Sequence, residues 1–226
     1  IELIVKDLGR KQEFLKSRVL PSADLNVFIG SSAKMIKQNV APEIIADEIR
    51  TYFGIDLNYL RTINKDRVLA YIVACCESKG ILVSFSSHNY MPQNLNSSLE
   101  LSGICIKDKK FPYIFINSRD GDAKPKIIES SGRQIFTLLT MLACIGMGKF
   151  VLSSQTGKSK DDPTKLAYRI ASEILIPKLD LNGFKIKTLE ELREKAHFFR
   201  VTPSMLLYRL QESGKITAGL ATSFRN

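Results

Sequence analysis

The sequence predicts an α+β fold, in which helices and a small, mostly antiparallel sheet occupy separate stretches of the chain. Two observations support this class. Segments with helical spacing of apolar residues occur on both sides of a central block of short segments that are rich in β-forming residues. Helical and strand segments do not alternate along the chain, as they would in an α/β protein with a parallel sheet.

The first part of the chain indicates helices. Residues 1–30 give only a weak signal, because short apolar groups alternate with polar breaks. Residues 34–53 carry apolar side chains at helical spacing, and Pro42 is expected to divide this stretch near its start. Residues 66–79 form a second predicted helix, with Val68, Ile72 and Cys76 on one side and Gly80 at its end.

The central block predicts three strands. ILVSFSS at 81–87, LSGICIKD at 101–108 and PYIFINSR at 112–119 are rich in β-branched and aromatic residues. The second and third are joined by the short KKF segment, which predicts a hairpin with Lys107, Lys109 and Lys110 at its tip. The stretches at 88–100, 120–128 and 151–163 are expected to be loops.

Helices are expected again in the last part of the chain. Residues 129–148 form a long apolar helix, and residues 164–175 form another that Pro177 closes. TLEE at 188–191 is a capping box, in which the Thr188 hydroxyl accepts from the amide of Glu191 and the Glu191 carboxylate returns a bond. Thr202 and Pro203 begin a following helix. These last two helices form a pair that resembles a helix-turn-helix.

Composition excludes several classes of protein. The chain has 226 residues, of which 44% are hydrophobic and 25% charged, enough for one large domain or two small ones. No uninterrupted apolar run reaches the ~18 residues of a membrane helix. The four cysteines have no zinc-finger spacing, since Cys75 and Cys76 are adjacent and no CxxC occurs. Unpaired thiols on apolar segments fit a reducing cytoplasm.

The net charge of +10 suggests a polyanionic partner, but the distribution weakens this interpretation. Residues 1–60 contain eight basic and eight acidic side chains, and the basic surplus is spread over the rest of the chain. A general solvated basic surface is therefore favoured over a dedicated phosphate-binding face.

Two local patterns give little support for a phosphate-binding or metal-binding site. TGKS at 156–159 resembles the end of a phosphate-binding loop, but Leu152 stands where that loop needs its first glycine. His88 and His197, the two histidines of the chain, have no cysteine or acidic partner at ligand spacing. A catalytic triad is not excluded by sequence order, although no nucleophile elbow of the GxSxG type is present.

Four stretches occur in this order along the chain: PYIFIN at 112–117, RQIFTLLTMLACIGMG at 133–148, LAYRIASEILIP at 166–177 and VTPSMLLYRL at 201–210. ESKGILVSF at 77–85 and SGICI at 102–106 precede them. Taken together, over about residues 35–215, these segments resemble the ImmA/IrrE family of zinc metallopeptidases. The resemblance implies a zincin-like arrangement of the α+β fold, with the small sheet packed on helices.

The sequence differs from the family at the positions of the zinc ligands and the general base. The resemblance places the two zinc-binding histidines of an HExxH motif at Thr140 and Cys144, and the general base at Met141. The third, carboxylate, ligand falls near Thr164 or Leu166. Threonine is a poor zinc ligand, a single thiolate lacks partners, and Met141 cannot accept a proton from water. No catalytic residue, metal or cofactor is therefore expected. Asp120, Asp122 and Glu129 could instead form an unusual cation site before the helix.

The sequence therefore predicts a catalytically inactive relative that acts by binding. The family resemblance implies a sensor or docking module of a transcriptional regulator or antitoxin in a prophage or mobile element. A protein partner or small ligand is expected in the former substrate cleft, between residues 112–117 and 133–148. The expected organisation is an N-terminal helical segment (1–60), a metallopeptidase-like core (61–180) and a C-terminal helical subdomain (181–226). The start at Ile1 suggests a fragment that has lost an N-terminal DNA-binding module.

Two alternatives stay open. One is an active metallopeptidase with non-standard ligands that cleaves a repressor. The other is a DNA-binding protein that uses its basic surface and the C-terminal helical pair, with Arg193, Lys195, Arg200 and Arg209 as the contact residues. No membrane partner is expected.

Overall fold

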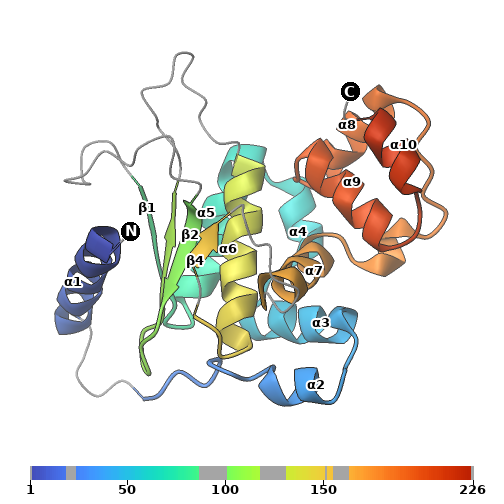
Figure 1. Cartoon of the computed structure of the whole chain (residues 1–226). Coiled ribbons are helices and arrows are strands. Elements are labelled where there is room, and N and C mark those ends of the chain that lie inside the picture. The colour runs from blue at the N-terminus through green and yellow to red at the C-terminus, as the bar shows by residue number, and fades with distance from the viewer. Residues whose placement is uncertain are drawn as a thin grey trace.

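The computed structural model describes residues 2–18, 24–86, 101–117, 131–150, 152–154 and 163–224. It confirms the α+β class (Figure 1). The helices that precede the first strand are α1 (Glu2–Arg18), α2 (Ala33–Lys37), α3 (Pro42–Phe53), α4 (Leu57–Thr62) and α5 (Lys65–Glu77). The strands are β1 (Leu82–Phe85), β2 (Leu101–Ile106), β3 (Tyr113–Ile116) and β4 (Leu152–Ser154). The remaining helices are α6 (Ser131–Gly146), α7 (Pro163–Leu175), the 3₁₀ helix η1 (Lys178–Leu181), α8 (Leu189–Phe198), α9 (Pro203–Glu212) and α10 (Ala218–Ser223).

The described strands form one mixed sheet in the order β1-β3-β2-β4. The predicted hairpin is confirmed, since β2 pairs with β3 in antiparallel fashion. β4 pairs antiparallel to β2, whereas β1 pairs parallel to β3. The prediction of a loop over residues 151–163 was wrong at Leu152–Ser154, because three residues are too few to show the alternation that marks a strand.

The two faces of the sheet are covered by different helices. Alternation along β3 directs Tyr113 and Phe115 to one face and Ile114 and Ile116 to the other. Ile114 and Ile116 belong to the main core with α6, while Tyr113 and Phe115 pack in a smaller cluster with Ile4 and Leu8 of α1 (Figure 1). The 17-residue helix α1 was missed from the sequence, because its apolar stripe is narrow and is stabilised by this contact with the sheet.

Local signals in the sequence set most helix ends. Pro42 occupies the first turn of α3 and separates it from α2, as predicted. Gly80, just after α5, has a φ of +73°, a conformation that suits glycine. Thr188 caps α8 by accepting from the amide of Glu191 at 3.1 Å, while the Glu191 carboxylate accepts from the amide of Lys187 at 2.7 Å. The capping box is therefore present, with its return bond to the residue before the cap.

Helix α6 lies against the sheet at a glycine. A Cβ at Gly103 of β2 would lie 2.8 Å from Cγ2 of Thr137 and 3.1 Å from the carbonyl oxygen of Phe115. No side chain fits in that space, so Gly103 allows α6 to approach the sheet closely. This contact positions the helix that carries the predicted site.

Candidate functional site

Helix α6 carries three of the positions that the family resemblance assigns to zinc chemistry. Thr140, Met141 and Cys144 are all fully buried, each with 0% exposure. The hydroxyl of Thr140 donates to the carbonyl oxygen of Phe136 at 2.8 Å, one turn earlier in the same helix. The oxygen that would stand in place of a ligand is thus engaged in the helix backbone, a common arrangement for a buried threonine.

Met141, at the position of the general base, is part of the contact between α6 and the sheet. Its Cγ atom would lie 3.5 Å from a Cβ placed on Gly103, on the same side of the helix as Thr137. The thioether is an apolar packing group that has no basic atom. Residue 141 therefore stabilises the fold and cannot activate water.

The remaining ligand position lies on the neighbouring helix. Thr164 is buried in the first turn of α7. Helices α6 and α7 are packed together, and the ring of Phe136 stacks on Tyr168 with centroids 5.7 Å apart. The structure thus brings the helices of the predicted site into contact, but the side chains present at positions 140, 141, 144 and 164 include no carboxylate and no imidazole.

Other candidate ligands do not form a metal site in the part of the chain that the structure describes. Within those residues, no three His, Cys, Asp or Glu side chains are placed so that they could hold a metal ion. His197 is exposed on α8, where its Nδ1 lies 3.4 Å from the guanidinium of Arg200. His88, Asp120, Asp122, Glu129 and the TGKS segment lie outside the described residues. No disulfide joins any of the four cysteines.

The predicted cleft between residues 112–117 and 133–148 is closed where the structure describes it. All residues of β3 are buried, and Ile114 and Ile116 share one apolar core with Leu138, Leu142 and Ile145 of α6. Side chains fill the space between the strand and the helix. The expected position of the ligand was therefore wrong for these residues, because α6 packs directly on the sheet at Gly103.

The four cations proposed for DNA contact have different environments. Arg193 is exposed on α8, and Lys195 lies with its ammonium 4.5 Å from the centroid of the Phe184 ring. Arg200 is half-buried in the turn between α8 and α9, with a φ of +59°, and donates to the carbonyl of Arg61 at 2.8 Å. It therefore fixes the turn against α4.

Arg209 was predicted wrongly as a nucleic-acid contact. Only 4% of the residue is exposed, because Met205, Leu206 and Leu210 of the same helix are also buried and turn most of α9 inward. Its Nε donates to the carbonyl oxygen of Ile176 at 2.9 Å, and its Nη2 forms an ion pair with Glu173. The Arg209 side chain is therefore part of the buried core and stabilises the packing of α9 on α7.

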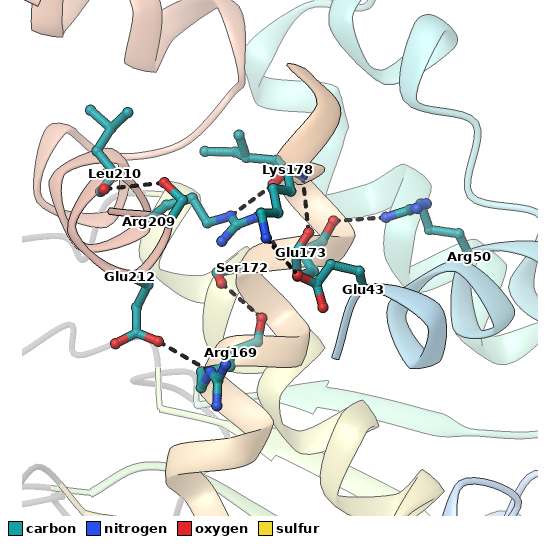
Figure 2. A network of polar contacts seen from close by, with 11 residues as sticks. Glu43, Arg50, Arg169, Ser172, Glu173, Lys178, Arg209, Leu210 and Glu212 are labelled. Atoms are coloured by element: carbon teal, nitrogen blue, oxygen red, sulfur yellow. Dashed lines mark hydrogen bonds and ion pairs between the residues drawn. The ribbon is translucent and has the colours of Figure 1, made fainter. Parts of the chain in front are cut away.

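Glu173 and Arg209 are the centre of a polar network that sequence reasoning missed (Figure 2). Glu173 of α7 also accepts from the amide of Lys178 at 3.1 Å, and its own carbonyl oxygen accepts from Arg50 of α3 at 2.7 Å. Burial raises the pKa of Glu173 above its ordinary value, although Arg209 and the Lys178 amide act in the opposite direction. The network joins α3, α7, η1 and α9, so its role is structural.

Among the hollows that described residues line, two contain charged side chains of the tail or its neighbours. One is a polar cavity of about 100 Å³ beside the Glu173–Arg209 pair, lined also by Glu43, Arg169 and Lys178. The other is an open groove of about 470 Å³, called here the aromatic groove. It is lined by Arg61, Asp180, Phe184, Glu194, Lys195, Phe198 and Phe199.

The aromatic groove combines rings with cations. The guanidinium of Arg61 lies 5.3 Å from the centroids of both Phe198 and Phe199, and it forms an ion pair with Asp180. Phe198 is 54% exposed. An exposed ring held beside a paired cation is a surface that suits an apolar or aromatic group of a partner.

Comparison with known proteins gave no relative: no family model, no curated protein and no solved structure matches this chain.

Proposed function

We propose that the chain is a catalytically inactive, zincin-like domain of the ImmA/IrrE type, which acts as a docking or sensor module of a transcriptional regulator or antitoxin in a prophage or mobile element. One observation carries the proposal. The helix that the resemblance aligns with the HExxH helix is α6, which lies almost entirely buried between the sheet and α7, and its Thr140, Met141 and Cys144 serve packing and helix bonding.

Physical chemistry favours this combination. A buried His-Glu-His cluster without a metal would carry a desolvation cost, since polar groups without partners are unfavourable in a core. Uncharged side chains at these positions avoid that cost and keep the helix packed. An active metallopeptidase with other ligands is less well supported, because the side chains at positions 140, 141, 144 and 164 supply neither a base nor a set of zinc ligands.

The aromatic groove is the docking surface that we propose for a partner. It lies between α4, η1 and α8 and exposes Phe198, whereas the described residues of the predicted cleft are buried. Aromatic side chains are enriched at the energetic centres of protein interfaces. A partner segment that carries an apolar side chain and a charged group would match the rings and the ion pair of Arg61 with Asp180.

Restoring the missing zinc ligands tests the family assignment. The variant T140H/M141E/C144H/T164E places imidazoles and carboxylates where the resemblance implies them. We expect it to bind one zinc ion per chain and to unfold at a higher temperature with zinc than without it, since binding to the native state stabilises it. The natural sequence should show no stoichiometric zinc by elemental analysis.

A shifted variant is the matched control. L139H/M141E/A143H/T164E has the same number of new ligands, with two histidines four residues apart, but on a different face of α6. It should bind no zinc. Equal zinc binding by both variants, or a restored variant that folds by circular dichroism and takes up no zinc, would contradict the zincin-like assignment. Stoichiometric zinc and peptidase activity in the natural chain would contradict the proposal that the domain is catalytically inactive.

A further inference from the structure

Seven lysines gather at one end of the molecule, named here the basic end. They come from α2, from the residues after α5 and α6, and from the β2–β3 hairpin: Lys34, Lys37, Lys79, Lys107, Lys109, Lys110 and Lys149. In Figure 1 the hairpin and α2 lie at the lower end of the view, away from the tail helices α8 to α10 at the upper right. All seven are exposed except Lys110, which is half-buried.

Backbone and side-chain hydrogen bonds hold these separate segments together. Asn26 joins two of them, since its amide donates to the carbonyl of Lys109 at 2.8 Å and its Nδ2 donates to the carbonyl of Lys79 at 2.9 Å. The carbonyl of Lys149 accepts from Cys105 Sγ of β2 at 3.7 Å. The amide of Ser32, just before α2, donates to the carbonyl of Gly146 at the end of α6, at 2.9 Å.

Few acidic groups offset these lysines. The acidic residues on the same segments are Asp24, Glu77 and Asp108, and Asp108 is already paired with Lys16 at 2.7 Å. Among the described residues, no carboxylate lies within ion-pair distance of Lys107, Lys109 or Lys149. Within the described segments that form it, the basic end therefore has more lysines than carboxylates, and three of these lysines have no described carboxylate within ion-pair distance.

The C-terminal helical pair lacks such a surplus. Its cations include the buried Arg209 and the turn residue Arg200, and Glu190, Glu191, Glu194 and Glu212 lie on the same two helices. Helix α9, which would be the recognition helix of a helix-turn-helix, buries most of its length against the core. Among the described segments, the larger surplus of basic over acidic side chains is therefore at the basic end.

We propose that the basic end binds the phosphate backbone of duplex nucleic acid without reading its sequence. Lysine ammonium groups are flexible point charges, which neutralise phosphates and release counterions but do not give the fixed geometry that base recognition requires. The exposed Leu25 and Val27 lie beside this surface. No described helix there presents the broad apolar face with which proteins bind a membrane interface, so a nucleic acid fits better than a lipid surface.

Fluorescence anisotropy of a labelled 25-base-pair duplex with the full chain tests the proposal. We expect binding at 50 mM NaCl that weakens steeply toward 200 mM, as phosphate contacts require. The variant K107E/K109E/K149E should weaken binding by about 10-fold or more at one salt concentration, and should reduce the slope of log K against log salt by about 2–3.

A charge-matched tail variant, K187E/R193E/K215E, is the control. These three residues are exposed and the total change in charge is the same. We expect a loss of less than about 3-fold, because distant charges are screened at this ionic strength. Both variants should keep the circular dichroism spectrum of the natural chain, and K107R/K109R/K149R should bind as the natural chain does.

Three results would overturn the proposal: no duplex binding at 50 mM NaCl, an equal loss in the tail variant, or binding only to phosphatidylserine vesicles with a dependence on Leu25 and Val27. The test does not involve zinc or α6. The basic end and the inactive-domain proposal can therefore fail independently.

Discussion

Asp108 stabilises the β2–β3 turn with both oxygens of its carboxylate. Oδ1 accepts from the amides of Lys110 and Phe111, each at 2.8 Å, and Oδ2 lies 2.7 Å from Nζ of Lys16 on α1. Burial alone would raise the pKa of this carboxyl, but the bonds from Lys16 and the two amides outweigh it and hold the pKa below its ordinary value. One side chain thus fixes the hairpin and attaches α1 to it.

Substitution of Asp108 should lower stability in a pH-dependent way. We expect Asp108→Ala to reduce the free energy of unfolding by about 1–2 kcal/mol at pH 7. Since the folded pKa is lowered, the stabilisation is fully present above the ordinary value of about 4 and is lost as pH falls through the folded value. Urea unfolding at pH 7, 5 and 3 measures this, and the difference from the natural chain should shrink at pH 3.

Asp108→Asn is the matched control, because asparagine keeps an acceptor for the two amides and loses the charge. It should cost less than the alanine variant at pH 7, and its stability should vary less with pH below 5. A difference between the natural chain and Asp108→Ala that stays constant from pH 7 to pH 3 would contradict the role of the carboxylate.

Single residues also show where sequence reasoning succeeds and where it fails. The caps Thr188 and Thr202 were predicted because their bonds are made within three residues, and both are confirmed. Arg209 was predicted at the surface because arginines usually are. Its partner Glu173 lies 36 residues away in sequence, and nothing local to either residue shows that they meet in the core.

The secondary-structure elements differ in the same way: α6 is determined by its own sequence, whereas β4 and α1 depend on contacts with distant parts of the chain. Helix α6 was predicted from its own long apolar sequence, and its burial follows from it. Strand β4 exists because β2 offers a free edge, and α1 is stabilised because the sheet offers an apolar face. The placement of Thr140 and Thr164 on adjacent packed helices was expected only from the family resemblance, while the closure of the predicted cleft depends on the packing of α6 at Gly103.

The contact at Gly103 predicts a strong effect of one methyl group. Gly103→Ala would place its Cβ 2.8 Å from Thr137 Cγ2, so α6 and β2 must separate or strain. We expect a loss of about 1–3 kcal/mol in the free energy of unfolding, as is typical of overpacked cores.

The double variant G103A/T137S removes the clashing Cγ2 and should regain part of this loss, measured by urea unfolding. Thr137→Ser alone should cost less than about 1.5 kcal/mol, because it removes one buried methyl group. If G103A/T137S is no more stable than Gly103→Ala, the clash with Thr137 Cγ2 is not the cause of the lost stability.

Loss of one member of the Glu173–Arg209 pair should lower stability in a way that depends on pH. Arg209→Met leaves a buried carboxylate without its cation and should cost about 3–5 kcal/mol at pH 7. Burial has already raised the pKa of Glu173. A raised folded pKa means that the protonated form is favoured in the folded state, so this variant should gain stability relative to the natural chain as pH falls and lose it as pH rises through the folded pKa.

The double variant E173L/R209M tests whether the unpaired charge causes that loss. Apolar residues of similar volume should restore most of the stability at pH 7, because neither charge is then buried. Urea unfolding of the natural chain, Arg209→Met, Glu173→Leu and the double variant at pH 5 and pH 7 forms a double-mutant cycle. Equal losses for Arg209→Met and for the double variant would show that packing, and not the unpaired carboxylate, determines the effect.

One apolar core includes residues from all three segments that the sequence suggested. The cluster includes Ile45 and Phe53 from the first, Leu138 and Ile174 from the second, and Leu206 from the third. Glu173 of the second segment forms an ion pair with Arg209 of the third, and its carbonyl oxygen accepts from Arg50 of the first. The segments 1–60, 61–180 and 181–226 therefore share their stabilising contacts.

This shared core predicts that the chain unfolds as one unit. Calorimetry should give a single transition, with a van't Hoff enthalpy equal to the calorimetric enthalpy, because no segment keeps a core of its own when the others unfold. Removing residues 181–226 should leave a chain that does not fold, since it exposes the apolar surface that Leu192, Leu206 and Leu210 cover and leaves Glu173 unpaired. Two separate transitions, or a folded and monomeric 1–180 fragment, would instead establish the C-terminal helices as an independent subdomain that a partner could displace.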